Sequence, residues 1–206
     1  VRLNTLATDL IFDEDGRACG VMTESGAIAG DGVILATGHS AHDTFRTLHA
    51  RGVGMEAKGI AVGVRLEHPQ TVIDRIQYHS PEGRGRYLPA AEYSFVTQAD
   101  GRGVYSFCMC PGGVVVGAAS EQNGLVTNGM SNYDRAGRNA NSALLVSVFP
   151  EDLPGTDVLG GVAFQRRLER GAFALGGGDW KAPCQLVGDF LAGRETTALG
   201  LSLIHI

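Results

Sequence analysis

The sequence predicts a chain of the α/β class, α+β overall, in which part of a Rossmann-like domain with an antiparallel meander precedes a mostly β domain. Three observations predict this fold. Residues 3–29 hold short strand-like segments, residues 33–38 form an uninterrupted apolar run, and short strands with glycine-containing turns follow residue 54. The 30 glycines against 7 prolines agree with it, because strand-rich domains need many tight turns.

The meander is expected from three strands at residues 3–12, 18–24 and 27–29. A turn-rich link at residues 13–17 and a tight turn at residues 25–26 separate them. Short links of this kind join neighbouring antiparallel strands.

The run at residues 33–38, VILATG, is apolar without alternation up to its final Thr-Gly. A strand that is buried on both faces, as in a parallel sheet between helices, has this pattern. Ser40 or Asp43 can cap a helix that follows it and ends near Gly52.

The second part of the chain reads as mainly β with three helices. A strand at residues 58–66 leads to a short helix at residues 71–78, and further strands are expected between residues 93 and 126 and at residues 143–149. Helices are expected at residues 161–175 and 183–191.

Composition narrows the function classes. A net charge of −5 gives no basic surface for nucleic acid or for an anionic membrane, and no apolar run has the length of a membrane helix. Four cysteines do not suggest a disulfide scaffold in a chain of 206 residues. The sequence therefore predicts a cytoplasmic protein with a small-molecule partner and leaves its oligomeric state open.

The meander and the apolar strand that ends in Ala36, Thr37 and Gly38 resemble the FAD domain of two-dinucleotide-binding-domain flavoproteins. At the carboxyl end of such a strand the backbone runs close to the cofactor, where glycine leaves room and a threonine hydroxyl can hydrogen-bond. The G-x-G-x-x-G phosphate loop is missing, since Gly101 and Gly103 lie in a turn that opens no helix. We expect that loop upstream of Val1.

Longer blocks extend the resemblance over most of the chain: residues 36–45, 59–70, 107–113, 128–148 and 176–185. The sequence is similar to bacterial NAD(P)/FAD-dependent oxidoreductases, an uncharacterised FAD-dependent dehydrogenase family of the glutathione-reductase superfamily. The resemblance implies FAD as cofactor, NAD(P)H as a possible electron donor and a redox reaction. It also implies that residues 1–53 are the distal part of the FAD-binding domain and that residues 54–196 are an inserted substrate domain. Residues 201–206 (LSLIHI) are expected to be a non-native tail.

Within this resemblance, the cofactor-binding candidates lie in two places. Ala36, Thr37, Gly38, His39 and Ser40 match the end of the final flavin-domain strand and the start of the next helix. Ala7, in the first meander strand, matches the position whose backbone meets the adenine.

The catalytic candidates are Cys108 and Cys110 in the segment CMCPGG, because a thiolate near a flavin can relay electrons or form an adduct. In an extended strand the two thiols would lie on one face. Two cysteines fall short of the four ligands of a zinc site, so no metal is expected, and a buried structural role is the alternative.

Two further alternatives stay open. Arg65, Glu67 and His68 either converge as an anion-holding or proton-transferring cluster, or end a solvated strand with Arg65 and Glu67 paired at the surface. For the whole chain, the alternative to a flavoenzyme is a non-enzymatic β-rich binding module.

Overall fold

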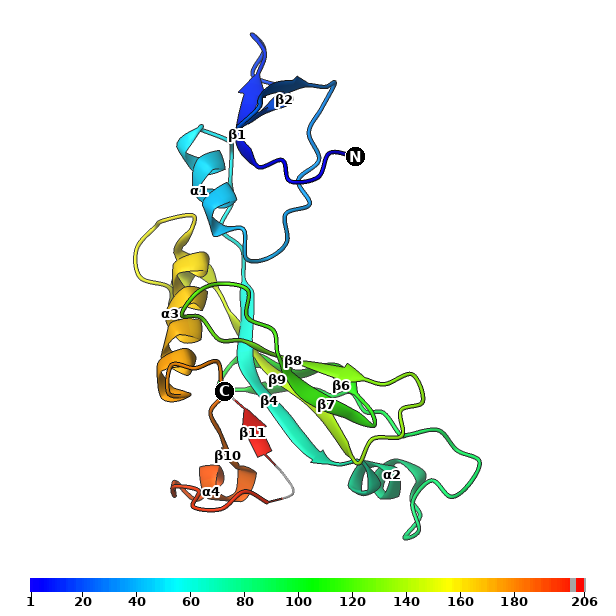
Figure 1. The fold of residues 1–206 in the computed structure, drawn as a ribbon. Helices are drawn as coiled ribbons and strands as arrows, with labels where there is room; N and C mark the ends of the chain where they lie inside the picture. Colours follow the sequence, from blue (N-terminus) through cyan, green and yellow to red (C-terminus); the bar gives the residue numbers. More distant parts are fainter. Residues whose placement is uncertain (201–202, 206) are drawn as a thin grey trace. The chain divides into compact units, whose positions relative to one another are not determined.

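The computed structural model describes residues 1–200 and 203–205. The chain divides into two compact units, Val1–Glu56 and Ala57–Ile206 (Figure 1). Each unit has its own sheet structure, and every strand pair in the described residues is antiparallel.

The first unit contains a three-stranded sheet in the order β1-β2-β3 and one helix. Its elements are β1 (Ala7–Phe12), β2 (Ala18–Thr23), β3 (Gly26–Ala29) and α1 (His42–Ala50). The turn between β1 and β2 forms because the Asp13 carboxylate accepts the backbone N–H groups of Asp15 and Arg17. The expected meander strands are therefore present, with the first beginning at Ala7.

The apolar run at residues 33–38 is not a strand, which corrects the sequence prediction. Its backbone is irregular, and Ile34 and Leu35 are 92% and 51% exposed. A two-face-buried strand needs neighbouring strands and covering helices, and the first unit pairs only its three meander strands. The prediction of a Rossmann-like α/β domain is wrong for this chain, which consists mostly of small antiparallel sheets with few helices.

The second unit is built on a six-stranded sheet in the order β10-β11-β4-β9-β6-β5. The six strands are β4 (Ile60–Pro69), β5 (Val96–Ala99), β6 (Arg102–Cys110), β9 (Asn139–Val148), β10 (Cys184–Leu186) and β11 (Leu203–His205). The long central pair, β4 and β9, stays in register over ten residues, with Arg65 opposite Ala143 and Glu67 opposite Asn141.

A two-stranded hairpin, β7 (Gly113–Gly117) and β8 (Thr127–Ser131), packs against β4, β6 and β9 (Figure 1). The helical elements of the unit are α2 (Gln70–Tyr78), η1 (Pro150–Asp152), α3 (Gly160–Leu175) and α4 (Val187–Leu191). The Leu125 N–H donates to the Glu169 carbonyl and so joins the segment before β8 to α3.

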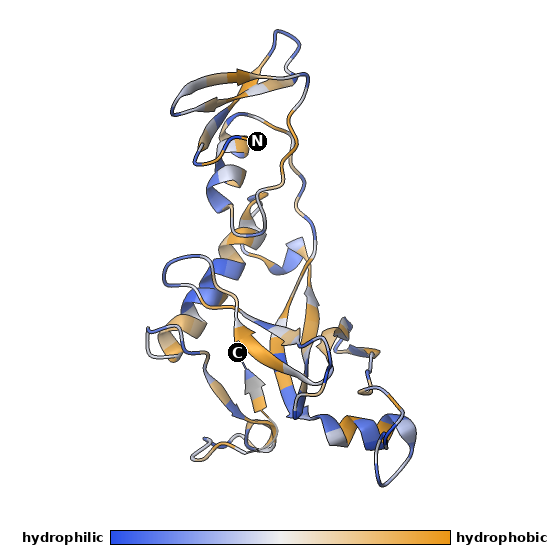
Figure 2. Ribbon diagram, turned by 45° about the vertical axis from the view of Figure 1, so that its right-hand side comes forward, coloured by the Kyte–Doolittle hydropathy of each residue, from blue (hydrophilic) through white to orange (hydrophobic). Residues whose placement is uncertain are grey.

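Apolar burial is thin in the second unit. Its fully buried apolar side chains are mostly alanines, with Leu125 the largest among them. Hydrophobic and hydrophilic residues are interspersed along both strands and helices (Figure 2). Buried polar side chains, among them Arg65, Gln70 and Asn141, therefore occupy positions that apolar residues fill in most cores.

Three residues of the tail that the sequence analysis leaves out of the fold belong to the sheet. Residues 203–205 pair with β4 on one side and β10 on the other, while residues 201, 202 and 206 lie outside the described part. The native or non-native origin of the tail stays a prediction. None of the helices in the described ranges has the length and hydropathy that a membrane span requires.

Candidate functional site

Residues 108–113 connect β6 to β7 through a strand irregularity and a tight turn. Phe107 pairs with Ala143 but Cys110 pairs with Asn141, so β6 carries one residue more than β9 between these pairs. Cys108 lies within this β-bulge and has a positive φ of 45°. The extended-strand argument that put both thiols on one face therefore does not hold. Both cysteines are free; Cys108 is exposed and Cys110 is half-buried.

Three hydrogen bonds hold the turn that follows. The buried Gln70 side chain accepts the Gly112 N–H at 2.7 Å, the Ser131 hydroxyl donates to the Pro111 carbonyl at 2.8 Å, and the Gly137 N–H donates to the Gly112 carbonyl at 3.2 Å. Gly112 has a φ of +54°, and a Cβ there would overlap a backbone carbonyl. The position thus requires glycine, and the turn is fixed from three segments.

A buried arginine on β4, two strands away from β6 in the same sheet, holds the bulge. Arg65 on β4 is 4% exposed, and its guanidinium donates to the Cys108 carbonyl at 3.2 Å and to the side-chain oxygens of Asn141 and Asn128 at 2.5 and 3.3 Å. Among the described residues, all of its hydrogen-bond acceptors are neutral. A buried cation that lacks a carboxylate depends on these bonds, because an unpaired buried charge is costly.

Asn141 on β9 completes this buried group. It is 0% exposed, and its Oδ1 faces Arg65, which carries only donors, so its Nδ2 must point elsewhere. That nitrogen has no hydrogen-bond partner among the described residues. A Cβ on Gly129 of β8 would overlap Asn141 Oδ1 and Arg65 Nη1 and would lie 2.8 Å from Cys110 Sγ. A guanidinium, an amide and a thiol therefore meet at this glycine.

Arg65, Glu67 and His68 do not converge as the first of the two alternatives requires. Alternation along β4 places Arg65 and Glu67 on one face of the sheet and His68 on the other. Glu67 accepts from Asn139 Nδ2 at 2.7 Å and contacts His205 Nε2 at 2.9 Å. Within the described ranges, the expected surface pair between Arg65 and Glu67 is absent.

His68 belongs instead to an aromatic group on the opposite face. The rings of His68 and Tyr93 are 5.6 Å apart, and Tyr93 stacks on Phe95 at 6.3 Å. Burial lowers the pKa of His68, although the nearby Glu67 charge opposes this shift. Burial also raises the pKa of Tyr93, against the opposing hydrogen bond with Ser142. His68 Nε2 has no hydrogen-bond partner in the described part of the chain.

The cofactor-binding candidates lie in the first unit. Ala7 begins β1 and is exposed, Ala36 and Thr37 lie in the irregular exposed segment, and Gly38 has a φ of +81°. His39 and Ser40 form a turn before α1, with His39 Nε2 and Ser40 Oγ 3.0 Å apart.

These residues do not build a site for the FAD pyrophosphate. Such a site uses glycine-loop N–H groups directly at a helix N-terminus, beside a parallel strand. In residues 1–200 and 203–205 no parallel strand is present, and the segment before α1 is irregular. Contact of the six candidates with FAD in a longer protein stays a prediction.

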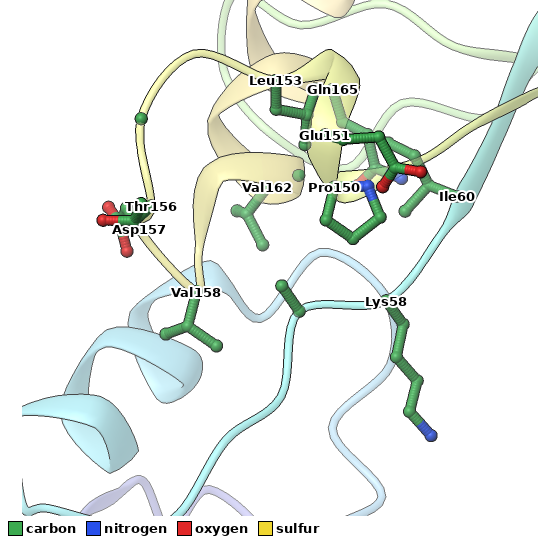
Figure 3. Close-up of a pocket in the computed structure, with 13 residues that line it drawn as sticks. Lys58, Ile60, Pro150, Glu151, Leu153, Thr156, Asp157, Val158, Val162 and Gln165 are labelled. Atoms are coloured by element: carbon green, nitrogen blue, oxygen red, sulfur yellow. The ribbon is translucent and has the colours of Figure 1, made fainter.

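A separate pocket of about 470 Å³ lies between the start of β4 and α3. Its walls are largely apolar, with Ile60, Leu153 and Val162 among them, and the Lys58 side chain extends away from this group (Figure 3). No thiol or histidine of the described chain lines it, and its charged lining residues are Lys58, Glu151 and Asp157.

Sequence reasoning missed three residues that build the site around the 108–113 turn. No sequence pattern distinguishes Gln70, Gly129 or the strand position of Asn141, because glutamine, glycine and asparagine are common near turns. The structure places Asn128 on β8 and Asn141 on β9, where their side-chain oxygens accept hydrogen bonds from Arg65.

Comparison with known proteins adds two findings. Residues 59–204 match the family described as "FAD-dependent protein, C-terminal domain-like". An uncharacterized protein of Clostridium beijerinckii (strain ATCC 51743 / NCIMB 8052) is 50% identical over 189 residues. That alignment covers 91% of this chain and 35% of the relative, so the chain spans about a third of the length of the curated relative it matches.

Proposed function

Since the chain belongs to the family of FAD-dependent proteins, C-terminal domain-like, we propose that it forms the substrate-side part of a larger flavin-dependent oxidoreductase that acts on a small molecule. Residues 54–196 are the substrate domain in this proposal, and residues 1–53 belong to the FAD-binding portion. The matched region, residues 59–204, includes the 108–113 turn and all the side chains that hold it. Family membership supports FAD and gives no support for NAD(P)H, so the electron donor stays open.

The observation that carries the proposal is the fixed turn with two free thiols. A thiol that takes part in a reaction must be held in place and be reachable. The hydrogen bonds of Gln70, Ser131 and Gly137 hold the turn, Arg65 holds the bulge, and Cys108 is exposed. We assign Cys108 and Cys110 to the redox reaction on this basis.

FAD, when bound, supplies hydride or electron transfer. The described residues form no pyrophosphate site, so we assign this chain a positional contribution. The Arg65 side chain carries only hydrogen-bond donors, and it donates to the carbonyl of Cys108, the bulge residue with a positive φ. The Gln70 side chain holds Gly112 by accepting its backbone N–H.

The test uses the whole protein that contains this chain, titrated anaerobically with dithionite while flavin absorbance is followed. A Cys108–Cys110 disulfide takes up two electrons and two protons to give two thiols, in addition to the two electrons of the flavin. We expect about four electrons per flavin in the oxidised wild type and about two in Cys108→Ser and Cys110→Ser, with unchanged flavin content.

An uptake of about two electrons in all three proteins would exclude a redox-active Cys108–Cys110 disulfide. A whole protein that contains no flavin would favour the non-enzymatic binding module. The 206-residue chain alone should stay colourless after incubation with FAD and desalting, because it has no phosphate loop. Retention of stoichiometric flavin by that chain would contradict this part of the proposal.

A further inference from the structure

A pocket of about 670 Å³ lies beside the 108–113 turn in the second unit. Residues from the end of β4, the first turns of α2, the loop at residues 82–85 and the segment at residues 136–138 line it. Two of the lining residues also hold the turn: Gln70 accepts the Gly112 N–H, and Gly137 donates to the Gly112 carbonyl. The pocket and the candidate thiol segment thus share their supporting residues.

Three arginines and two acidic residues set the charge of this pocket. The acidic Asp74 is buried and already bonded: its Oδ1 accepts from Gln70 Nε2 at 2.8 Å and from the Ala91 N–H at 2.9 Å, and its Oδ2 lies 3.6 Å from Arg84 Nε. Arg84 and Asp74 therefore offset each other's charge within this network. It leaves Arg75, Arg138 and Glu82 to face a ligand.

Arg75 and Arg138 have no side-chain hydrogen bond or ion pair with any other described residue. Both are exposed and both line the pocket, whereas most other arginines of the second unit hold a carboxylate or a carbonyl. Glu82 is exposed at the same pocket and reduces its positive charge without removing it. Two free guanidinium groups against one free carboxylate leave a net positive pocket.

We propose that this pocket binds the anionic group, a phosphate or a carboxylate, of a small-molecule ligand through Arg75 and Arg138. The planar guanidinium fork matches both anions in a bidentate geometry. Identifying that ligand as the substrate rests on the proposed function, but the anion site does not. Bound there, the ligand would lie against Gln70 and Gly137, one hydrogen bond away from the turn that follows Cys110.

The test measures anion binding to the 206-residue chain by NMR or isothermal titration at constant ionic strength. Inorganic phosphate and succinate are the two probes. We expect at least one of them to bind, and we expect Arg75→Gln and Arg138→Gln each to weaken that binding about fivefold or more. Glu82→Gln should strengthen it about twofold, since it removes the competing charge.

Arg167→Gln, on α3 and outside the pocket lining, is the charge-matched control and should leave the affinity unchanged. Binding of phosphate alone would identify a phosphate ligand, and binding of succinate alone a carboxylate ligand. The proposal is overturned if neither probe binds at concentrations up to about 50 mM, a generous limit on the scale of weak ligands. It is also overturned if all four variants bind alike. This experiment measures anion binding and not flavin content. A negative result would therefore overturn the anion site without testing the proposed flavoenzyme function.

Discussion

The sequence predicts that residues 33–38 and residues 108–113 both approach the cofactor. In the structure the first segment is exposed, whereas the second is held in place by hydrogen bonds. The first segment is irregular, and Ile34 projects almost fully into solvent at 92% exposure. The second is fixed by hydrogen bonds from Gln70, Ser131, Gly137 and Arg65.

The difference shows which sequence features also specify the residues that surround them in the fold. An apolar run becomes a buried strand only where other strands and helices cover it, and nothing in the run itself supplies them. A buried arginine must find oxygen acceptors, so the residues around it are specified together with it. Arg65 accordingly joins β4, β6, β8 and β9, whereas Ile34 has no comparable contacts within its unit.

The largest effect that this comparison predicts is at Arg65. Arg65→Met keeps the side-chain length but leaves the Cys108 carbonyl and the oxygens of Asn128 and Asn141 without their donor. Loss of several buried charged hydrogen bonds should lower the free energy of unfolding by about 3 kcal/mol. Urea denaturation of the 206-residue chain measures this change.

The matched change in the other segment is Ile34→Asn, which should alter the free energy of unfolding by less than about 0.5 kcal/mol. A cost above about 2 kcal/mol would mean that residues 33–38 are buried after all. A cost below about 1 kcal/mol for Arg65→Met would mean that its hydrogen bonds do not fix the bulge.

The same contrast explains how far the sequence could predict this structure. The strands at residues 7–29, the helices at residues 71–78 and 161–175 and the mainly β character of the second unit follow from local patterns and turn residues. The helix expected at residues 183–191 is wrong in its first part, because Cys184–Leu186 form strand β10 and the helix begins at Val187. The strand predicted at residues 33–38 is wrong because a strand buried on both faces needs neighbouring strands and covering helices. The first unit pairs only its three meander strands. The positive φ of Cys108 and the approach of Gly129 to Arg65 arise from contacts between strands far apart in the chain, which spacing cannot reveal.

Gly129 offers a second, intermediate effect. Gly129→Ala forces a Cβ into Asn141 Oδ1 and Arg65 Nη1, so the buried group must shift. Overpacking of this kind should lower the free energy of unfolding by about 1–3 kcal/mol. Thermal or urea unfolding provides the measurement.

Gly117 provides the control in the same hairpin, because a Cβ there would meet nothing within 4 Å. Gly117→Ala should leave stability within about 0.5 kcal/mol of the wild type. Equal costs for the two alanines would show that hairpin flexibility, rather than contact with Arg65 and Asn141, determines the effect.

The smallest effect concerns His68, three residues after Arg65 on β4 and on the other face of the sheet. Burial lowers its folded-state pKa below the ordinary value of 6.5, so as the pH falls the unfolded chain binds this proton first. The stability contributed by neutral His68 is therefore fully present above about pH 6.5 and is lost progressively at lower pH.

His68→Phe keeps a ring beside Tyr93, and it should flatten the slope of unfolding free energy between about pH 6.5 and 5. His49→Phe, at an exposed position on α1, should keep the wild-type slope. An unchanged slope in His68→Phe would show that burial does not lower the pKa of His68 in the folded chain.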